Sequence, residues 1–138
     1  MVGPFVAEGA WPAIADINTD AAKTAAAPSG AAAVAVHADV THQASIDAMV
    51  SATVAAIGGV DVLVNNAALF DPAPIVEIAH AGFHRLFDVS GEGLLFTLRA
   101  VAKQTIAQGR DGKIINMASQ AGRRGEPPVA VDCASKQR

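Results

Sequence analysis

The chain has 138 residues, 51% of them hydrophobic and 17% charged, so it can bury the core of one domain and is too apolar for a disordered segment. Its formal net charge of −3 disfavours nucleic-acid binding, and its single cysteine, Cys133, excludes an internal disulfide and a cysteine-cluster zinc site. The absence of tyrosine excludes a phenolic acid or base.

No apolar stretch reaches the ~18–20 residues of a membrane span, and residues 1–10 lack a signal-peptide pattern. We therefore expect a cytoplasmic protein that neither spans nor binds a membrane.

Apolar runs that fit strands alternate with segments that have helical spacing. The expected strands are 11–16, 32–38, 60–64 and 113–117, and the expected helices are 5–9, 19–27, a helix from an N-cap at Thr41 to Gly58, 75–88, 92–108 and 132–138. This alternation predicts an α/β fold, with a parallel sheet of about four strands and helices on both faces.

Polar residues follow the predicted strands at their carboxyl ends. Asp16, Asp39, Asn65 and Ser119 come at or just after the four strands. Ligands of such sheets bind beyond this edge, so these residues could line a cleft for a polar, extended ligand. The alternative is that Asp, Asn and Ser only form turns and helix caps, as they often do.

Three sequence segments carry a resemblance to the short-chain dehydrogenase/reductase family. They are VDVLVNNAA at 60–68, GKIINMASQAG at 112–122 and CASK at 133–136. Within the family, NNAALFDPAPIVEI at 65–78, NMASQAGRRGE at 116–126 and AIADIN at 13–18 are most similar to bacterial polyol dehydrogenases of the sorbitol and galactitol type. The resemblance implies a partial Rossmann-like, doubly wound fold and hydride transfer between NAD and an alcohol or ketone.

The resemblance also implies roles in cofactor binding. Asp16 corresponds to the acidic residue that accepts hydrogen bonds from the adenosine ribose and repels a 2′-phosphate, which favours NAD over NADP. The other implied cofactor-binding residues are Asp39 and Val40 beside the adenine, Asn65, Ala67 and Ala68 in the turn after the third strand, and Lys136 at the ribose.

Two of the implied catalytic positions depart from the family pattern. Ser119 matches the serine that binds the substrate oxygen, and Lys136 matches the lysine that tunes a neighbouring phenol. Asp132 stands at the tyrosine position, and Ser90 stands at the position of the catalytic asparagine. We therefore expect an oxidoreductase-type chain with impaired proton transfer.

The chain also has no glycine-rich phosphate loop. Residues 1–138 are thus expected to form one incomplete dinucleotide-binding domain that lacks the first strand, this loop and the C-terminal half. Without the loop, NAD would bind weakly or not at all. The alternatives are a non-catalytic NAD-binding or interaction protein on the same scaffold and a fragment without independent function.

The remaining histidine, charged and apolar residues of interest have simpler structural interpretations. His80 and His84 are spaced for one helix face, but no third ligand accompanies them, so no metal site is predicted. Asp132 could be only the N-cap of the last helix, and Lys136 only a solvated charge. The resemblance implies a homo-oligomer, with Leu94, Leu98, Val101 and Ile106 left exposed on the helix 92–108.

Overall fold

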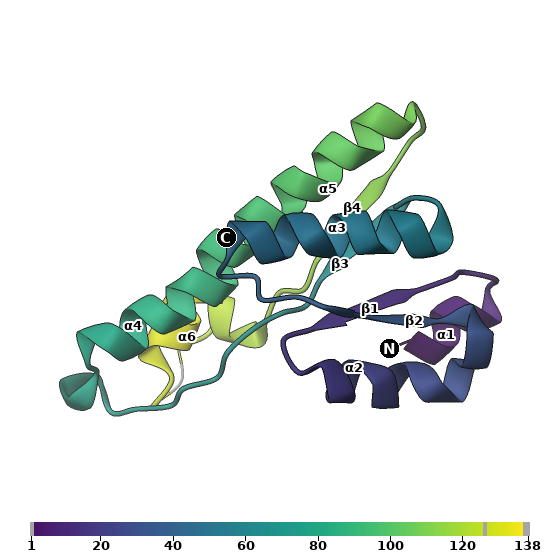
Figure 1. The fold of residues 1–138 in the computed structure, drawn as a ribbon. Helices are drawn as coiled ribbons and strands as arrows, with labels where there is room; N and C mark the ends of the chain where they lie inside the picture. Colours follow the sequence, from purple (N-terminus) through teal and green to yellow (C-terminus); the bar gives the residue numbers. More distant parts are fainter. Residues whose placement is uncertain (1, 126, 137–138) are drawn as a thin grey trace.

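The structure is a computed structural model that describes residues 2–125 and 127–136 (Figure 1). Its α-helices are α1 (Val2–Ala7), α2 (Thr19–Ala26), α3 (Gln43–Ile57), α4 (His80–Phe87), α5 (Leu94–Gln108) and α6 (Ala130–Lys136). Its strands are β1 (Ala13–Asp16), β2 (Val34–His37), β3 (Val62–Asn65) and β4 (Lys113–Asn116). Residues 137–138 of the last predicted helix lie outside the described residues.

The four strands form two parallel pairs. In the first pair Ala13 is opposite Val34, and in the second Val62 is opposite Lys113. The predicted α/β class with about four parallel strands is confirmed, and the described strands pair as two sheets of two. A backbone ladder needs strands about 4.8 Å apart. β1 and β3 form no ladder with each other among the described residues, so the sheet is divided between them.

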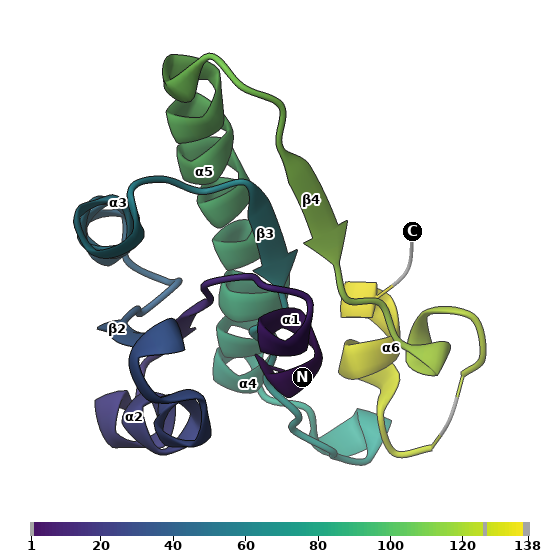
Figure 2. The ribbon, with the colours of Figure 1, turned by 90° about the vertical axis from the view of Figure 1, so that its right-hand side faces the viewer.

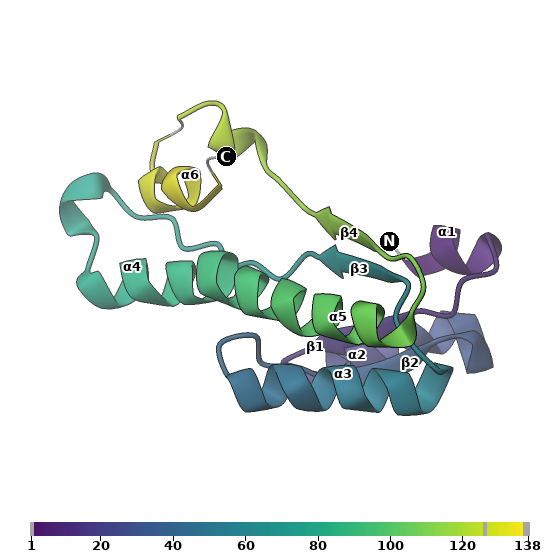
Figure 3. The ribbon, with the colours of Figure 1, turned by 90° about the horizontal axis from the view of Figure 1, so that it is seen from above.

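Helices α3 and α5 join the two sheets. They pack against each other, with α3 over β1 and β2 and α5 over β3 (Figures 2 and 3). One buried cluster includes Val36 from β2, Ile46 and Met49 from α3, and Val101 from α5, while Leu63 of β3 packs against it. Residues of both sheets and both helices thus share one apolar core.

A glutamine side chain fixes the end of α5 to the start of the second sheet. Gln108 accepts a hydrogen bond from the Val60 N–H at 2.8 Å, and its amide donates to the Val60 carbonyl at 3.0 Å. This pairing satisfies both backbone groups of a residue just before β3. Since Gln108 is the last residue of α5, the contact holds that helix in line with the strand.

The ends of α3 are only partly as predicted. Gly58 ends the helix in the left-handed conformation, with φ of 82°, which glycine adopts without strain. The predicted N-cap, Thr41, is wrong: the helix begins at Gln43 and the N-cap position is His42. The Thr41 hydroxyl donates to the Asp39 carboxylate, one residue before the N-cap position.

The helix predicted over 75–88 begins only at His80, and from there it continues without a break into the helix predicted over 92–108. A short 3₁₀ turn, Ile75–Glu77, precedes α4, and a π-helical segment, Asp88–Gly93, links α4 to α5. Such π segments insert an extra residue per turn and often mark functional sites. Ser90 and Gly93 lie in this segment and are both buried.

The expected exposed stripe on α5 is partly wrong. Val101 is 4% exposed because it faces the core shared with α3, whereas Ile106 is 79% exposed. Leu94 and Leu98 are half-buried, and Leu95, which the prediction missed, is exposed. The apolar outer surface of α5 is therefore smaller than expected.

We predict that Gly93→Ala destabilises the fold by about 1–3 kcal/mol, the usual cost of overpacking. An added Cβ would lie 2.8 Å from Cγ2 of Val40 and 3.0 Å from the carbonyl oxygens of Val40 and Asp88. Gly91→Ala is the matched control, since its Cβ would meet only Phe87 Cδ1 at 3.8 Å. Urea unfolding of both variants measures the difference, and equal stabilities would show that Val40 does not pack against Gly93.

Candidate functional site at the strand ends

The end of the first sheet presents a carboxylate beside a histidine. Asp16 is the last residue of β1, and His37 is opposite it at the end of β2. Oδ1 of Asp16 accepts from the Asn18 N–H at 2.8 Å, while Asn18 caps α2 by accepting from the Asp20 and Ala21 N–H groups. Asp16 is exposed and held by this turn, with its carboxylate at the surface.

His37 was missed by the sequence analysis. Its Nδ1 lies 3.5 Å from the Thr19 hydroxyl at the start of α2. The signal that could have identified it is register: Asp16 ends the predicted strand 11–16, His37 is the second-last residue of the predicted strand 32–38, and strands that pair in parallel bring their ends together.

Asp39 is the centre of a tight local network. Its Oδ1 accepts from the Thr41 hydroxyl at 2.6 Å and from the Thr41 N–H at 2.9 Å. Its Oδ2 lies 3.1 Å from His42 Nδ1, and its own N–H donates to the Ser45 hydroxyl. Donation from the Thr41 hydroxyl and then from the Thr41 N–H lowers the pKa of Asp39 below its ordinary value, because both bonds favour the carboxylate.

Val40 links this network to the π-helical segment. Its side chain and carbonyl lie against Gly93, at a distance that leaves no room for a Cβ there. Val40 is half-buried as a result. The first sheet and the segment that carries Ser90 are therefore in direct contact near the strand ends.

The end of the second sheet is formed by two asparagines. Asn65 is buried at the end of β3, and its Nδ2 donates to Oδ1 of Asn116 at 2.9 Å. Asn116 is opposite Asn65 in the ladder and was also missed, although the strand prediction 113–117 contained it. Ala67 and Ala68, which follow in the turn, are exposed.

The last helix brings its lysine to the π-helical segment. Lys136 Nζ lies 3.4 Å from the hydroxyl of Ser90, and both residues are at least partly buried. The reading of Lys136 as a solvated charge is therefore wrong. The two residues are 46 positions apart in the chain, so tertiary packing of α6 on the segment makes the contact.

Asp132 lies inside α6 rather than at its N-cap, which corrects that alternative. The helix begins at Ala130, and Asp132 is only 5% exposed. Its Oδ2 is buried without a hydrogen-bond partner among the described residues. A buried carboxylate oxygen in this state is costly, which is typical of positions that serve something other than stability.

Ser119 is not in contact with the Lys136–Ser90 pair. It is exposed, and its hydroxyl accepts from the Ala121 N–H at 3.2 Å, capping the short 3₁₀ turn Gln120–Gly122. The turn packs against α6, so Ser119 is next to an element that contacts the helix. The structure therefore brings Ser90 and Lys136 together directly, and Ser119 near them only through α6.

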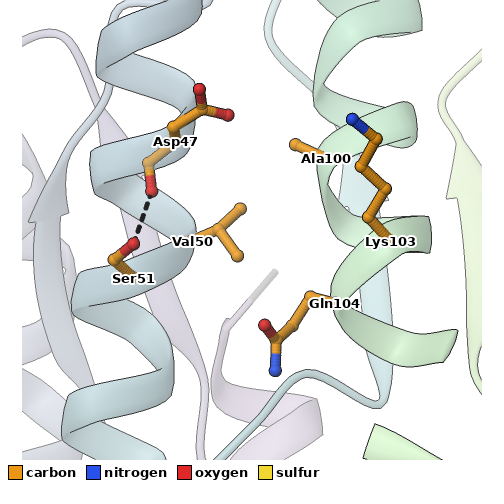
Figure 4. A pocket seen from close by; sticks show the side chains of 6 residues that line it. All are labelled: Asp47, Val50, Ser51, Ala100, Lys103 and Gln104. Carbon is orange, nitrogen blue, oxygen red and sulfur yellow. Dashed lines mark hydrogen bonds between the residues drawn. The ribbon is translucent and has the colours of Figure 1, made fainter. Parts of the chain in front are cut away.

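Other features of the described residues are separate from the strand ends. A groove of about 260 Å³ between α3 and α5 is lined by Asp47, Val50, Ser51, Ala100, Lys103 and Gln104, none of them a candidate site residue (Figure 4). His80 and His84 stack with ring centroids 6.4 Å apart, and no group of three potential metal ligands occurs within residues 2–125 and 127–136. Over the same residues, every helix is too short or too polar to cross a bilayer.

We predict that Thr41→Val raises the pKa of Asp39 toward its ordinary value, because the shorter of the two Thr41 hydrogen bonds is lost. A folded pKa below the unfolded one means that Asp39 stabilises the fold above about pH 4 and that this stabilisation is lost as pH falls. The variant should therefore lose less stability on acidification than the wild type. Carboxyl-carbon NMR titration checks the shift, and an unchanged Asp39 pKa would contradict the role of Thr41.

The chain is similar to known proteins along its whole length. The family model described as enoyl-(acyl carrier protein) reductase matches residues 1–138. The sorbitol dehydrogenase of Cereibacter sphaeroides is 58% identical over 132 residues, and the galactitol 2-dehydrogenase of Agrobacterium fabrum is 54% identical. Each alignment covers 96% of this chain and 52% of the relative, so the chain spans about half the length of these relatives.

Solved structures agree with the sequence comparisons. The 3-ketoacyl-(acyl-carrier-protein) reductase of Brucella melitensis, solved in complex with NADH, superposes with a TM-score of 0.89 at 32% identity, over 96% of this chain and 56% of that one. Sorbitol-6-phosphate 2-dehydrogenase of Erwinia amylovora gives a TM-score of 0.85 at 27% identity, over 96% of this chain and 54% of the other. From the family match over its full length and these Rossmann-type neighbours, the chain belongs to the short-chain dehydrogenase/reductase family.

Proposed function

We propose that this chain represents an NAD-dependent dehydrogenase of the short-chain type that acts on polyols or secondary alcohols, with impaired proton transfer in residues 1–138. The contact between Lys136 and Ser90 carries the proposal, because it joins the family's lysine position to its asparagine position. The identities of 58% and 54% to a sorbitol and a galactitol dehydrogenase support the substrate class.

The residues at the end of the first sheet fit the adenosine half of a nicotinamide dinucleotide. Asp16 has one carboxylate oxygen held by Asn18 and remains exposed, so it can accept hydrogen bonds from ribose hydroxyls. Asp39 and Val40 follow the neighbouring strand, where they would flank the adenine, and Asn65, Ala67 and Ala68 would lie beside the cofactor at the second sheet. When bound, the cofactor accepts the hydride that leaves the alcohol carbon.

The proton of the alcohol needs a separate acceptor. Ser119 would hold the substrate oxygen, and Lys136 would hold the ribose and polarise the proton path through Ser90. At the acceptor position Asp132 offers a carboxylate, which is a far weaker base than a phenolate. Its side chain is also shorter and buried, so it cannot reach as far as a phenol would.

Loss of one tuned acid or base lowers rates by roughly 10²–10⁴-fold. The proposal therefore includes low or absent turnover in this chain. A non-catalytic NAD-binding protein on the same scaffold is the alternative, and Asp132 is the observation that favours it: its Oδ2 is buried and unpartnered among the described residues rather than set toward a substrate.

The proposal also covers assembly and location. Leu95 and Ile106 leave apolar surface exposed on α5, which favours a homo-oligomer. The location that goes with the proposed function is the cytoplasm. A clean monomer by light scattering at tens of micromolar, an order of magnitude typical of interface affinities, would count against the oligomer.

We predict no measurable NADH formation by the wild-type chain with sorbitol, galactitol or simple secondary alcohols. Asp132→Tyr should rescue little, because the sequence has no glycine-rich loop to bind the pyrophosphate. Absorbance of NADH and calorimetric titration with NAD measure the two steps separately. Asp20→Tyr, at an exposed position on α2, is the control for adding a phenol.

Each outcome of this assay has a clear reading. Clear turnover by the wild type would refute impaired proton transfer. Tight NAD binding without turnover would favour the non-catalytic alternative. Substantial rescue by Asp132→Tyr alone would show that the cofactor binds well without the loop.

A second prediction concerns the choice between NAD and NADP. Asp16→Ser should remove the repulsion of a 2′-phosphate, so that 2′,5′-ADP binds the variant at least as well as 5′-AMP does. The wild type should prefer 5′-AMP, and Asp20→Ser, two residues beyond the Asn18 turn, should keep that preference. Calorimetry with the two nucleotides measures the ratio, and an equal preference in wild type and Asp16→Ser would remove Asp16 from the cofactor site.

A further inference from the structure

The segment that follows β2 holds three polar side chains in mutual contact. The Thr41 hydroxyl oxygen lies 2.6 Å from Oδ1 of Asp39 and 2.9 Å from Nδ1 of His42. The same ring nitrogen lies 3.1 Å from Oδ2 of Asp39. Within this group Thr41 and His42 are the side chains that can supply a hydrogen, because an ionised carboxylate only accepts.

These contacts determine where the two hydrogens lie. The pKa of Asp39 is lowered, first by the Thr41 hydroxyl and then by the Thr41 N–H, so its carboxylate is ionised and the hydroxyl donates to Oδ1. Nδ1 of His42 then faces two acceptors, Oδ2 of Asp39 and the hydroxyl oxygen of Thr41, and must itself carry a hydrogen. If Thr41 donated to Nδ1 instead, both oxygens of Asp39 would face bare acceptors. The hydrogen on Nδ1 is required whether the ring is neutral or charged.

Helix capping does not account for His42. The residue occupies the N-cap position of α3, where Ser, Thr, Asp and Asn are preferred because their side chains accept from N–H groups of the first turn. The His42 side chain makes no such bond to the helix. Its ring contacts Asp39 instead, which indicates a role at the carboxylate.

The hydrogen bonds leave one acceptor position on Asp39. A carboxylate has about four lone pairs, two on each oxygen. Thr41 fills both positions on Oδ1 with its hydroxyl and its N–H, and His42 fills one position on Oδ2. Among the described residues no donor fills the last position. Since the Asp39 side chain is 24% exposed, a ligand can reach it.

His42 also sets the direction of the open position. The two bonds from Thr41 hold Oδ1 but leave the carboxylate free to turn about that oxygen. The bond from Nδ1 of His42 holds Oδ2 and so fixes the plane of the carboxylate. A donor that approaches Asp39 from outside therefore meets an acceptor that is already oriented.

We propose that His42 is a positioning residue that makes nucleotide binding selective for an amino purine. The inference rests on the proposed function, in which Asp39 flanks the adenine. The amino group at C6 of adenine can donate to the open position on Oδ2, whereas hypoxanthine has a carbonyl oxygen there, which the carboxylate repels. Asp39 discriminates between the two bases, and His42 orients Asp39.

The first test determines the hydrogen position on His42 in the wild-type chain by NMR of the ring nitrogens. At about pH 8.5, above the range in which histidines normally change charge, ¹⁵N shifts and long-range couplings distinguish a hydrogen on Nδ1 from one on Nε2. We expect the hydrogen on Nδ1, and exposed His80 of α4 is the reference in the same spectrum. A hydrogen on Nε2 of His42 would overturn this inference and leave the proposed function untouched.

The second test compares 5′-AMP with 5′-IMP by chemical-shift titration of the wild type, His42→Asn and His42→Gln. The asparagine amide nitrogen can take the place of Nδ1, whereas the glutamine amide nitrogen takes the place of Nε2. We expect the preference for 5′-AMP to fall about fivefold in His42→Gln, as for loss of one hydrogen bond, and to be kept in His42→Asn. Ribose and phosphate are common to both ligands, so a general loss of affinity leaves the ratio unchanged.

The outcomes separate this inference from the proposed function. Binding of 5′-AMP with the same preference in the wild type and His42→Gln would overturn the role of His42 alone. Loss of the preference in both variants would do the same, because a donor at the Nδ1 position would then not suffice. Failure of 5′-AMP to bind the wild type would overturn the proposed cofactor site and this inference with it. The His42 side chain is 73% exposed, so both variants are expected to fold.

Discussion

The packing of α3 against α5 is the contact on which the rest of the molecule depends. Two strands on each side would not form a stable sheet alone, since small sheets need an apolar face covered by another element. Ile46 and Met49 of α3 and Val101 of α5 supply that cover, and residues of both sheets contact the same cluster. Gln108 adds a polar link by satisfying both backbone groups of Val60.

This shared core also positions the candidate site. Parallel strands that are held by one helix layer end on the same side, which brings the Asp16–His37 end and the Asn65–Asn116 end to one edge. The close approach of Val40 and Gly93 then connects the first sheet to the π-helical segment, and Ser90 in that segment contacts Lys136 of α6. Of the four proposed catalytic residues, Ser90 and Lys136 are thus brought into contact by tertiary packing.

The sequence predicted the local elements well because their signals are local. Apolar runs predicted the four strands to within a few residues, and α3 ends at Gly58 as predicted; Gly58, and Gly109 at the end of α5, adopt the left-handed conformation. It could not predict the division into two sheets, which depends on strand neighbours, or the π-helical link, which depends on how Ser90 and Gly93 pack. The helix begins one residue later than the predicted Thr41 cap allows, with His42 at the N-cap position, and the burial of Val101 required knowing that α3 lies beside it.

The central claim is that one core, centred on α3 and α5, makes the two sheets a single cooperative unit. Native-state hydrogen exchange in increasing denaturant tests it by comparing amides that lie inside the two ladders, Val36 of β2 and Ile115 of β4. The account predicts that both exchange through the same global opening, with free energies that converge and fall with the same dependence on denaturant. Two persistently different opening free energies would contradict it, because the sheets would then unfold independently of each other.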